Sequence, residues 1–454
     1  MQGILATLMF VAPDWVLGLT RERRTNAFWA EYVVWPTIQI LIVLFVVLTL
    51  VAYLVWIERK VSAFMQARLG PMRVGPWGLL QPAADGLKLL LKEDIIPIKA
   101  DRMVFALAPI ISVVAALIVL AVIPWGAAWA TIANINIGLL FILAVSSVGV
   151  LGLVLAGWAS NSKYSLLGAL RSSAQMVSYE IGLGLSIIGA LMFARTLSMS
   201  GIVEAQQADH VWYIFFQPLG FLVYLISALG ETNRAPFDLP EAESELVAGY
   251  HTEYSGFRWA LFFMAEYSAM LVTAAVAVTL FLGGWSFPGI TGTSLFGVGP
   301  IHNPTLHTIA SVLVFGLKIM LLIYAYMWFR WTWPRYRYDQ LMELGWKWMI
   351  PAALANIVLT GIWYVLALPE AKGGVFNLMR DVGGRLVPTG KGVIYFIVTG
   401  TVITVPLIWL LLARINRRSR DFNLHDQRQL QISLRRERLE KSLRPQPADG
   451  GGGQ

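Results

Sequence analysis

A strongly acidic stretch is the first feature of this chain that suggests chemistry. Residues 230–256 read GETNRAPFDLPEAESELVAGYHTEYSG, in which Arg234 is the only lysine or arginine. Six carboxylates accompany it: Glu231, Asp238, Glu241, Glu243, Glu245 and Glu253. On a helix, Asp238, Glu241 and Glu245 would share one face, since they are spaced by three and four residues. Like charges that close raise one another's pKa until a proton is shared, so the group could hold and pass protons near neutral pH.

The alternative interpretation of this stretch is a solvated acidic loop without a proton-carrying role. Pro236, Phe237, Pro240 and Tyr250 are interleaved with the acids. Such apolar and rigid residues favour a packed segment over a solvated one.

Three further ionisable residues fall inside long apolar runs: Glu180 in AQMVSYEIGLG, Glu266 in FFMAEYSAM and Lys318 in VFGLKIMLL. If the runs cross a membrane, Glu180 lies about one turn deep, Glu266 roughly 12 Å and Lys318 roughly 17 Å. Charges there are costly and typically face a protein interior or a water-filled cavity. We predict a proton path from the acidic stretch inward. The alternative is one buried ion pair between Lys318 and a glutamate, which only fixes helix packing.

The elements that must position these residues are apolar helices. Hydrophobic residues make up 57% of the 454 residues and charged residues 14%, against about 25% charged in a soluble domain. The pattern predicts an all-α polytopic integral membrane protein, because apolar runs of roughly 20 residues can each cross the hydrocarbon core as a helix. Nine such runs lie at 37–57, 104–124, 138–158, 177–195, 213–230, 258–282, 306–329, 350–368 and 393–413.

The distribution of positive residues predicts the orientation of these spans. The connections after spans one, three, five and seven and the C-terminal tail carry 25 of the 35 lysines and arginines, and the opposite side carries 8. Because positive residues are retained in the cytoplasm, we expect the N-terminus outside and the acidic stretch and C-terminus inside. The net charge of +8 is thus a sign of membrane orientation, and we expect no nucleic-acid partner.

The missing residue types exclude several redox roles. The chain has no cysteine, so it cannot ligate an iron–sulfur cluster, attach a c-type haem or form a disulfide. None of the five histidines forms an i, i+4 pair suited to a metal. We therefore expect no metal or cofactor on this chain and electrons, if any, from a partner.

The connection over residues 58–103 contains an amphipathic helix. One predicted face carries Leu80, Ala83, Ala84, Leu87 and Leu91, and the opposite face carries Asp85, Lys88 and Lys92. This pattern is typical of a helix that lies in the membrane interface. Such a surface could bind lipid headgroups, a partner protein or a long-tailed amphiphile.

Several segments together resemble one family. They are ERK at 58–60, GPMRVGPWGLLQPAADGLKLLLKEDIIP, SYEIGLGLS, PFDLPEAESELVAGYHTEYSG and PRYRYDQLMELGWK. Over about residues 31–367 the chain resembles the NuoH family, a membrane subunit of the proton-pumping NADH:quinone oxidoreductase, respiratory complex I. In that family the subunit joins the peripheral redox arm to the membrane arm, and its cytoplasmic loops form the quinone cavity together with peripheral subunits.

The resemblance implies roles for particular residues. Arg59, Arg68 and Arg73 would line or support the quinone entrance, and Phe237 would contact the quinone. The loop acids Asp238, Glu241, Glu243 and Glu245 would couple quinone reduction to proton movement. Glu180, Glu253 and Glu266 resemble members of the family's glutamate chain, and we place Lys318 with this relay. A contact role and a proton role remain equally open for Arg330, Arg335, Arg337, Asp339 and Lys347.

The resemblance also implies a substrate, cofactors on partner subunits, a set of partners and a cellular location. Quinone would be the substrate, and NADH, FMN and iron–sulfur clusters would sit on partner subunits. The partners would be peripheral subunits at the quinone site, small subunits of the membrane arm, and membrane lipid. We expect a bacterial plasma membrane.

The chain departs from the family at its end. We expect an N-terminal periplasmic or interfacial segment at 1–36, an eight-span core at 37–368, a loop and an extra ninth span at 369–413, and a disordered basic cytoplasmic tail at 414–454. Two other functions stay open: the membrane subunit of an energy-converting hydrogenase, and a stand-alone ion or proton transporter. The first would come with a nickel subunit, and the second would come alone and show an inverted repeat, which is not visible here.

Overall fold

The computed structural model describes residues 34–127, 130–238, 248–287, 303–369, 374–382, 385–402, 404–406 and 409. Residues 1–401 form one compact unit and residues 402–454 a second, and the account below concerns the first. Glu241, Glu243 and Glu245 lie outside the described residues, as do nearly all of the predicted N-terminal segment and the whole of the basic tail.

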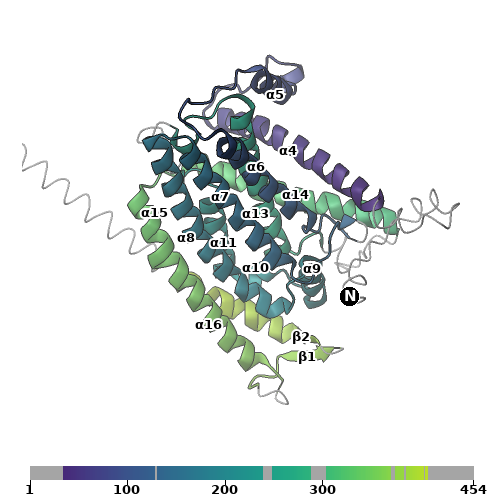
Figure 1. Cartoon of the computed structure of the whole chain (residues 1–454). Helices are drawn as coiled ribbons and strands as arrows, with labels where there is room; N and C mark the ends of the chain where they lie inside the picture. The colour runs from purple at the N-terminus through teal and green to yellow at the C-terminus, as the bar shows by residue number, and fades with distance from the viewer. Residues whose placement is uncertain are drawn as a thin grey trace, which may run out of the picture. The chain divides into compact units, whose positions relative to one another are not determined.

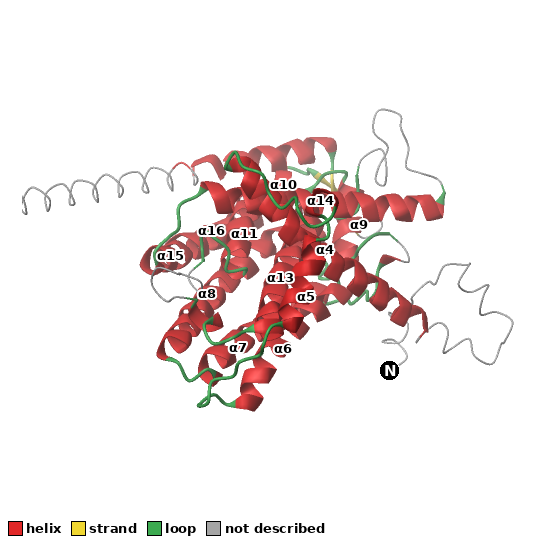
Figure 2. Ribbon diagram, turned by 90° about the horizontal axis from the view of Figure 1, so that it is seen from above, coloured by secondary structure: helices red, strands yellow, loops and turns green. Residues whose placement is uncertain are grey.

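Helices make up nearly all of the described chain (Figures 1 and 2). The longer ones are α4 (Trp35–Met65), α5 (Gln81–Leu91), α6 (Arg102–Ile118), α7 (Gly138–Ala159), α8 (Lys163–Ala194), α9 (Met199–Asp209), α11 (Pro218–Glu231), α13 (Gly256–Phe281), α14 (Pro304–Thr332) and α16 (Ile350–Ala367). The short ones are η2 (Pro76–Gly78), η3 (Val119–Ala121), α10 (Tyr213–Phe216), η5 (Gly249–His251), α15 (Tyr338–Leu344) and the π-helical turn η6 (Gly345–Met349).

Seven helices among the described residues are long and apolar enough to cross a membrane. They correspond to seven of the nine predicted spans, which supports a helical membrane protein. The predicted fifth span is divided between α10 and the 14-residue α11, and the ninth falls on a shorter apolar helix over Gly390–Pro406. The fifth is divided and the ninth extends beyond the described residues, so the number nine stays a prediction.

Two features of the fold stand out from the sequence-based expectation: the start of α8 and a β-hairpin. Helix α8 begins at Lys163 and has 32 residues, about 48 Å of helix, although the predicted span begins at 177. The sequence does not reveal its first part because Ser165, Ser172 and Gln175 lower the hydropathy there, yet all three are fully buried against other helices. The other difference is a hairpin of β1 (Met379–Val382) and β2 (Arg385–Pro388), which the all-α prediction does not contain.

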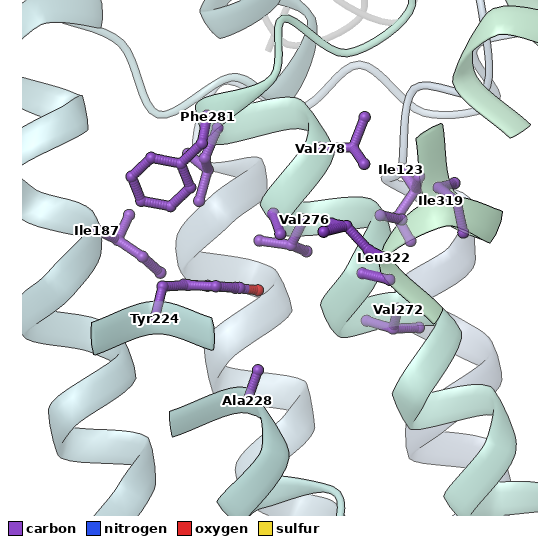
Figure 3. Packing of buried hydrophobic residues seen from close by; sticks show 14 of the residues in the cluster. Ile123, Ile187, Tyr224, Ala228, Val272, Val276, Val278, Phe281, Ile319 and Leu322 are labelled. Atoms are coloured by element: carbon purple, nitrogen blue, oxygen red, sulfur yellow. The ribbon is translucent and has the colours of Figure 1, made fainter. Parts of the chain in front are cut away.

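Helix α13 lies at the centre of the first unit. Every residue from Met270 to Phe281 is buried, and α13 contacts α6, α14, α11, α4 and α9. A helix that is apolar all round must be enclosed by other helices. Figure 3 shows this packing, with Tyr224 of α11 next to Phe281 and with Ile319 and Leu322 of α14 on another side.

A polar group fixes α11 against α16 inside the apolar region. The Gln217 side chain donates to Thr360 Oγ1 at 2.9 Å and accepts from Asn356 Nδ2 at 2.7 Å. All three side chains are buried. Buried polar groups must find partners, so this group favours one register of the two helices.

Candidate functional site

Five ionisable side chains from four parts of the chain meet in one cluster. Arg234 donates from Nη1 to Glu58 Oε2 at 2.6 Å and from Nε to Glu266 Oε1 at 2.7 Å. Tyr267 donates its hydroxyl to the same Glu58 oxygen at 2.7 Å, and Arg330 pairs with the other Glu58 oxygen. The Arg234 guanidinium also lies 4.1 Å from the centre of the Tyr267 ring. We call these five residues the carboxylate–arginine cluster.

Members of the cluster differ in how far solvent reaches them. The side chains of Arg234 and Glu58 are 4% and 6% exposed, whereas those of Glu266 and Arg330 are 18% and 30% exposed. Burial opposes the charged form of Arg234, but the negative charges of Glu266 and Glu58 and the Tyr267 oxygen outweigh it and raise the pKa of Arg234. Arg234 is therefore a fixed positive charge, and a proton moving through the cluster must be carried by a carboxylate.

The loop that carries Arg234 is held by helix α8 and by the segment after α14. Gln175 Nε2 donates to the carbonyls of Gly230 at 2.8 Å and Phe237 at 2.7 Å. The backbone N–H of Tyr336 donates to the Pro236 carbonyl at 3.2 Å. Because both ends of the loop are tied to neighbouring segments, the Arg234 guanidinium is pre-positioned between its two carboxylates.

A cavity of about 100 Å³ lies beside Glu266. Its walls carry Glu266 of α13, Glu231 at the end of α11 and Ser146 of α7, among mostly small and apolar residues. A space of this size with several polar partners can hold a few water molecules. The cavity therefore joins the carboxylate–arginine cluster to a second carboxylate.

That second carboxylate belongs to a pair held by neighbouring serines of α7. Ser146, whose hydroxyl donates to the Leu143 carbonyl at 2.9 Å, lies close enough to stabilise the Glu231 carboxylate, and Ser147 donates to Glu180 of α8. The charges of Glu180 and Glu231 repel each other, which places them within electrostatic range. The structure thus arranges four glutamates in the order Glu58, Glu266, Glu231 and Glu180, with the cavity in the middle.

The structure brings two of the predicted relay glutamates into this arrangement, Glu266 as its second member and Glu180 as its last. Asp238 is 5% exposed, its carboxylate accepts from Arg335 Nη2 at 2.7 Å, and its charge acts on Glu266 of the cluster. Glu253 lies in the turn after η5, and none of the contacts found among the described residues joins it to the cluster. Burial lowers the pKa of the nearby His251 to about 3, so its ring is neutral at physiological pH.

The predicted quinone-binding residues lie in two different environments, one exposed and one buried. Arg59, Arg68 and Arg73 are exposed around helix α5, where Arg59 pairs with Asp85 at 2.7 Å. Phe237 is 1% exposed instead and stacks on Tyr336 with ring centres 5.7 Å apart. Phe237 therefore supports the loop from inside, and the quinone contact predicted for it stays a prediction.

Lys318 lies far from the carboxylate–arginine cluster. Its ammonium donates to the backbone carbonyls of Leu282, Gly284 and Ser286. Glu266 precedes Leu282 by 16 residues along the chain, about 24 Å of helix. Among the described residues no ion pair joins Lys318 to a glutamate, which is the alternative considered from the sequence.

Helix α5 has the amphipathic character predicted for it. None of its residues is buried in this chain, and Leu80, Leu87 and Leu91 are 55%, 59% and 78% exposed. An apolar face with basic neighbours that no described residue covers fits a lipid interface or a partner surface.

The sequence alone does not reveal Glu58 as a functional residue and suggests no role for Arg234. Glu58 ends an apolar run, where a charged residue is the ordinary start of a connection. Its partner Arg234 lies 176 residues away, a separation that no periodic pattern reveals. The one available signal is that Arg234 is the only base among six acids.

Among the described residues, no group of three or more His, Cys, Asp or Glu side chains could hold a metal ion. The chemistry supported by the arrangement is proton transfer between carboxylates and electrostatic response to a nearby charge.

Comparisons with known proteins agree with the motifs of the sequence. Residues 38–361 match the NADH dehydrogenase family. The second of two NADH-quinone oxidoreductase H-subunits of Koribacter versatilis is 49% identical over 350 residues, covering 72% of this chain and 96% of that protein. The H-subunit of Rhodospirillum rubrum is 50% identical, covering 73% and 96%, and that of Bacillus cytotoxicus is 49% identical, covering 75% and 97%. Residues 362–454 lie beyond the family match.

Proposed function

The chain belongs to the NuoH family of NADH-quinone oxidoreductase, respiratory complex I, and we propose from this that it forms part of the quinone chamber and couples quinone reduction to proton translocation through its carboxylates. As a multi-pass membrane subunit of that enzyme it is part of a translocase with other complex I subunits as partners. The observation that carries the proposal is the cavity between Glu266 and Glu231, because it joins two sets of carboxylates inside the membrane region.

Quinone reduction produces a negative charge, and the carboxylates of this chain can respond to that charge by changing their protonation. Reducing a quinone to quinol takes two electrons and two protons, so negative charge develops on the headgroup before protons arrive. In a low-dielectric chamber a new charge changes the protonation of nearby acids. The loop acids Asp238, Glu241, Glu243 and Glu245 are the first groups in our proposal to respond, with Arg59, Arg68 and Arg73 at the entrance.

The carboxylate–arginine cluster is the next step. Glu58 and Glu266 share Arg234, so the charge of one affects the protonation of the other. A proton accepted by Glu266 can leave through water in the cavity to Glu231 and then to Glu180. We assign Arg234 and Tyr267 to holding the two carboxylates in place, since neither the guanidinium nor the phenol exchanges protons readily near neutral pH.

The same proposal includes the orientation of the chain in the membrane and the location of the cofactors. We place the N-terminus outside and the acidic loop, where quinone is reduced, and the C-terminus in the cytoplasm of a bacterium. The eight-span core would be followed by a ninth span. NADH, FMN and iron–sulfur clusters would sit on other subunits, and this chain, which has no cysteine, would hold none of them.

Filling the cavity tests the proposal without changing any charge. Ala116 of α6 lines the cavity, and Ala116→Leu would displace its water. We expect proton translocation by the assembled complex to fall by about tenfold or more, because a positioned proton step is interrupted, and quinone reduction to fall with it. The measurement is NADH-driven proton uptake and quinone reductase activity in membrane vesicles.

Val114→Leu on the same helix is the matched control, because Val114 is 46% exposed on another face of α6. This variant is expected to keep both activities. Unchanged translocation in Ala116→Leu, with the complex assembled, would remove the cavity from the path.

A further inference from the structure

Lys318 occupies a ring of backbone carbonyls. Its Nζ lies 2.6 Å from the Leu282 oxygen, 3.0 Å from that of Gly284 and 2.6 Å from that of Ser286. The ammonium also lies 4.6 Å from the centre of the Trp212 ring. A lysine ammonium has three N–H donors, so each of them has a carbonyl partner and the indole supplies a cation–π contact on one side.

The ring is built by the turn that ends α13. Leu282 caps the C-terminal end of the helix, where unpaired carbonyls and the helix dipole favour a positive charge. Gly283 and Gly284 follow with φ of 73° and 54°, a conformation that turns the next carbonyls back toward α14. The turn is closed by hydrogen bonds from Gly284 N–H to the Val278 carbonyl at 2.9 Å and from Ser286 N–H to the Gly283 carbonyl at 2.8 Å.

Larger residues do not fit at either glycine. A Cβ on Gly283 would lie 2.7 Å from the Trp212 ring, and one on Gly284 would clash with the Val203 side chain. The positive φ and the close neighbours thus select glycine at both positions. The backbone geometry that presents the three oxygens is therefore imposed by packing on α9 and on Trp212, separately from the lysine itself.

Nothing found at the ammonium among the described residues can take its proton. The acceptors are carbonyl oxygens, which do not titrate, and the remaining neighbour is an aromatic face. We infer that the carbonyls of Leu282, Gly284 and Ser286 together with the Trp212 ring form a binding site for a primary ammonium ion, which Lys318 fills from within the chain. Its role is to tie the end of α13 to the middle of α14.

The geometry of the site should select primary ammonium ions over quaternary ones. Three acceptors match the three N–H groups of a primary ammonium, whereas tetramethylammonium has no N–H donor and is wider. Truncation by Lys318→Ala removes three methylenes and the ammonium group. Propylammonium has the same three carbons and the same head, so it would replace the lost part, and methylammonium would fill only the carbonyl ring.

The test is chemical rescue of the whole complex. Lys318→Ala complex, purified in detergent, should lose quinone reductase activity on heating several times faster than wild type. Propylammonium chloride should restore the lifetime in a saturable way, methylammonium chloride should restore part of it, and tetramethylammonium chloride at equal concentration should restore none. Wild type and Lys163→Ala, which removes an exposed lysine at the start of α8, should not respond to propylammonium.

Two results would overturn the inference: an unchanged lifetime in Lys318→Ala, or equal rescue by propylammonium and tetramethylammonium. If Lys318→Ala does not assemble, Lys318→Arg and Lys318→Met provide the comparison. The arginine variant keeps a cation with N–H donors and should assemble more fully than the neutral methionine variant. Equal assembly of the two would contradict an ammonium site.

Discussion

Arg234→Met is expected to abolish quinone reduction and proton translocation, a larger effect than that of any other single substitution in the cluster. Arg234 is the shared partner of Glu58 and Glu266, and its side chain is 4% exposed. Removing one partner of a buried ion pair leaves an uncompensated charge and typically costs about 3–5 kcal/mol. Two carboxylates lose their partner here, so the cluster must rearrange or take up protons. The measurement is complex content and quinone reductase activity of membranes.

The arginines of the same region should rank by the number of buried carboxylates that each one pairs with: two for Arg234, one for Arg330 and none for Arg258. Arg330→Met is expected to have a smaller effect, because Arg330 is 30% exposed and Glu58 keeps Arg234 and Tyr267. Arg258→Met is the matched control, since Arg258 pairs with Asp94 at 3.1 Å and Asp94 is 41% exposed. Exposed pairs contribute only about 0–1 kcal/mol. Normal activity in Arg234→Met membranes would show that the cluster is not needed for coupling.

Glu266→Gln is expected to give an assembled complex with little coupled activity. Glutamine has the size of glutamate and can still accept from Arg234, so packing around α13 is kept. The variant cannot take up a proton at this position, and loss of a positioned proton carrier typically lowers rates by about 100-fold or more. Quinone reductase activity and proton uptake, each divided by the amount of assembled complex, measure the effect.

Glu93→Gln is the control for this variant, because Glu93 is exposed beyond α5 and outside the path. It should behave as wild type. A Glu266→Gln complex that pumps normally would limit Glu266 to a packing role with Arg234.

The helices and their membrane character are predictable from the sequence, and the pairing of charges is not. Apolar runs reveal the spans, because a helix that crosses lipid must be apolar along its length. The first half of α8 gives no such signal, because its serines and Gln175 are buried by other helices and not by lipid. The strands β1 and β2 are separated in the sequence by Gly383 and Gly384, a hairpin turn signal that is weak beside the long apolar runs.

The glutamates proposed for the relay are identifiable because a charge inside an apolar run stands out. Their order is not predictable from depth along each helix, since Glu266 and Glu180 are joined through Glu231 and a cavity built by α6, α7, α11 and α13. Lys318 has the same signal in the sequence, but its ammonium contacts backbone carbonyls among the described residues, and its predicted place in the relay stays a prediction. Depth alone does not distinguish a proton carrier from a tied cation.

The most direct test of the central claim is the activity of a Glu180→Gln complex. Glu180 is the far end of the proposed path, bonded to Ser147 and separated by the cavity from the carboxylate–arginine cluster. The account predicts that quinone reduction and proton uptake, measured together in vesicles, both fall by about tenfold or more, while Glu204→Gln, an exposed glutamate of α9, keeps both. Normal quinone reduction and normal proton uptake in assembled Glu180→Gln complex would contradict it.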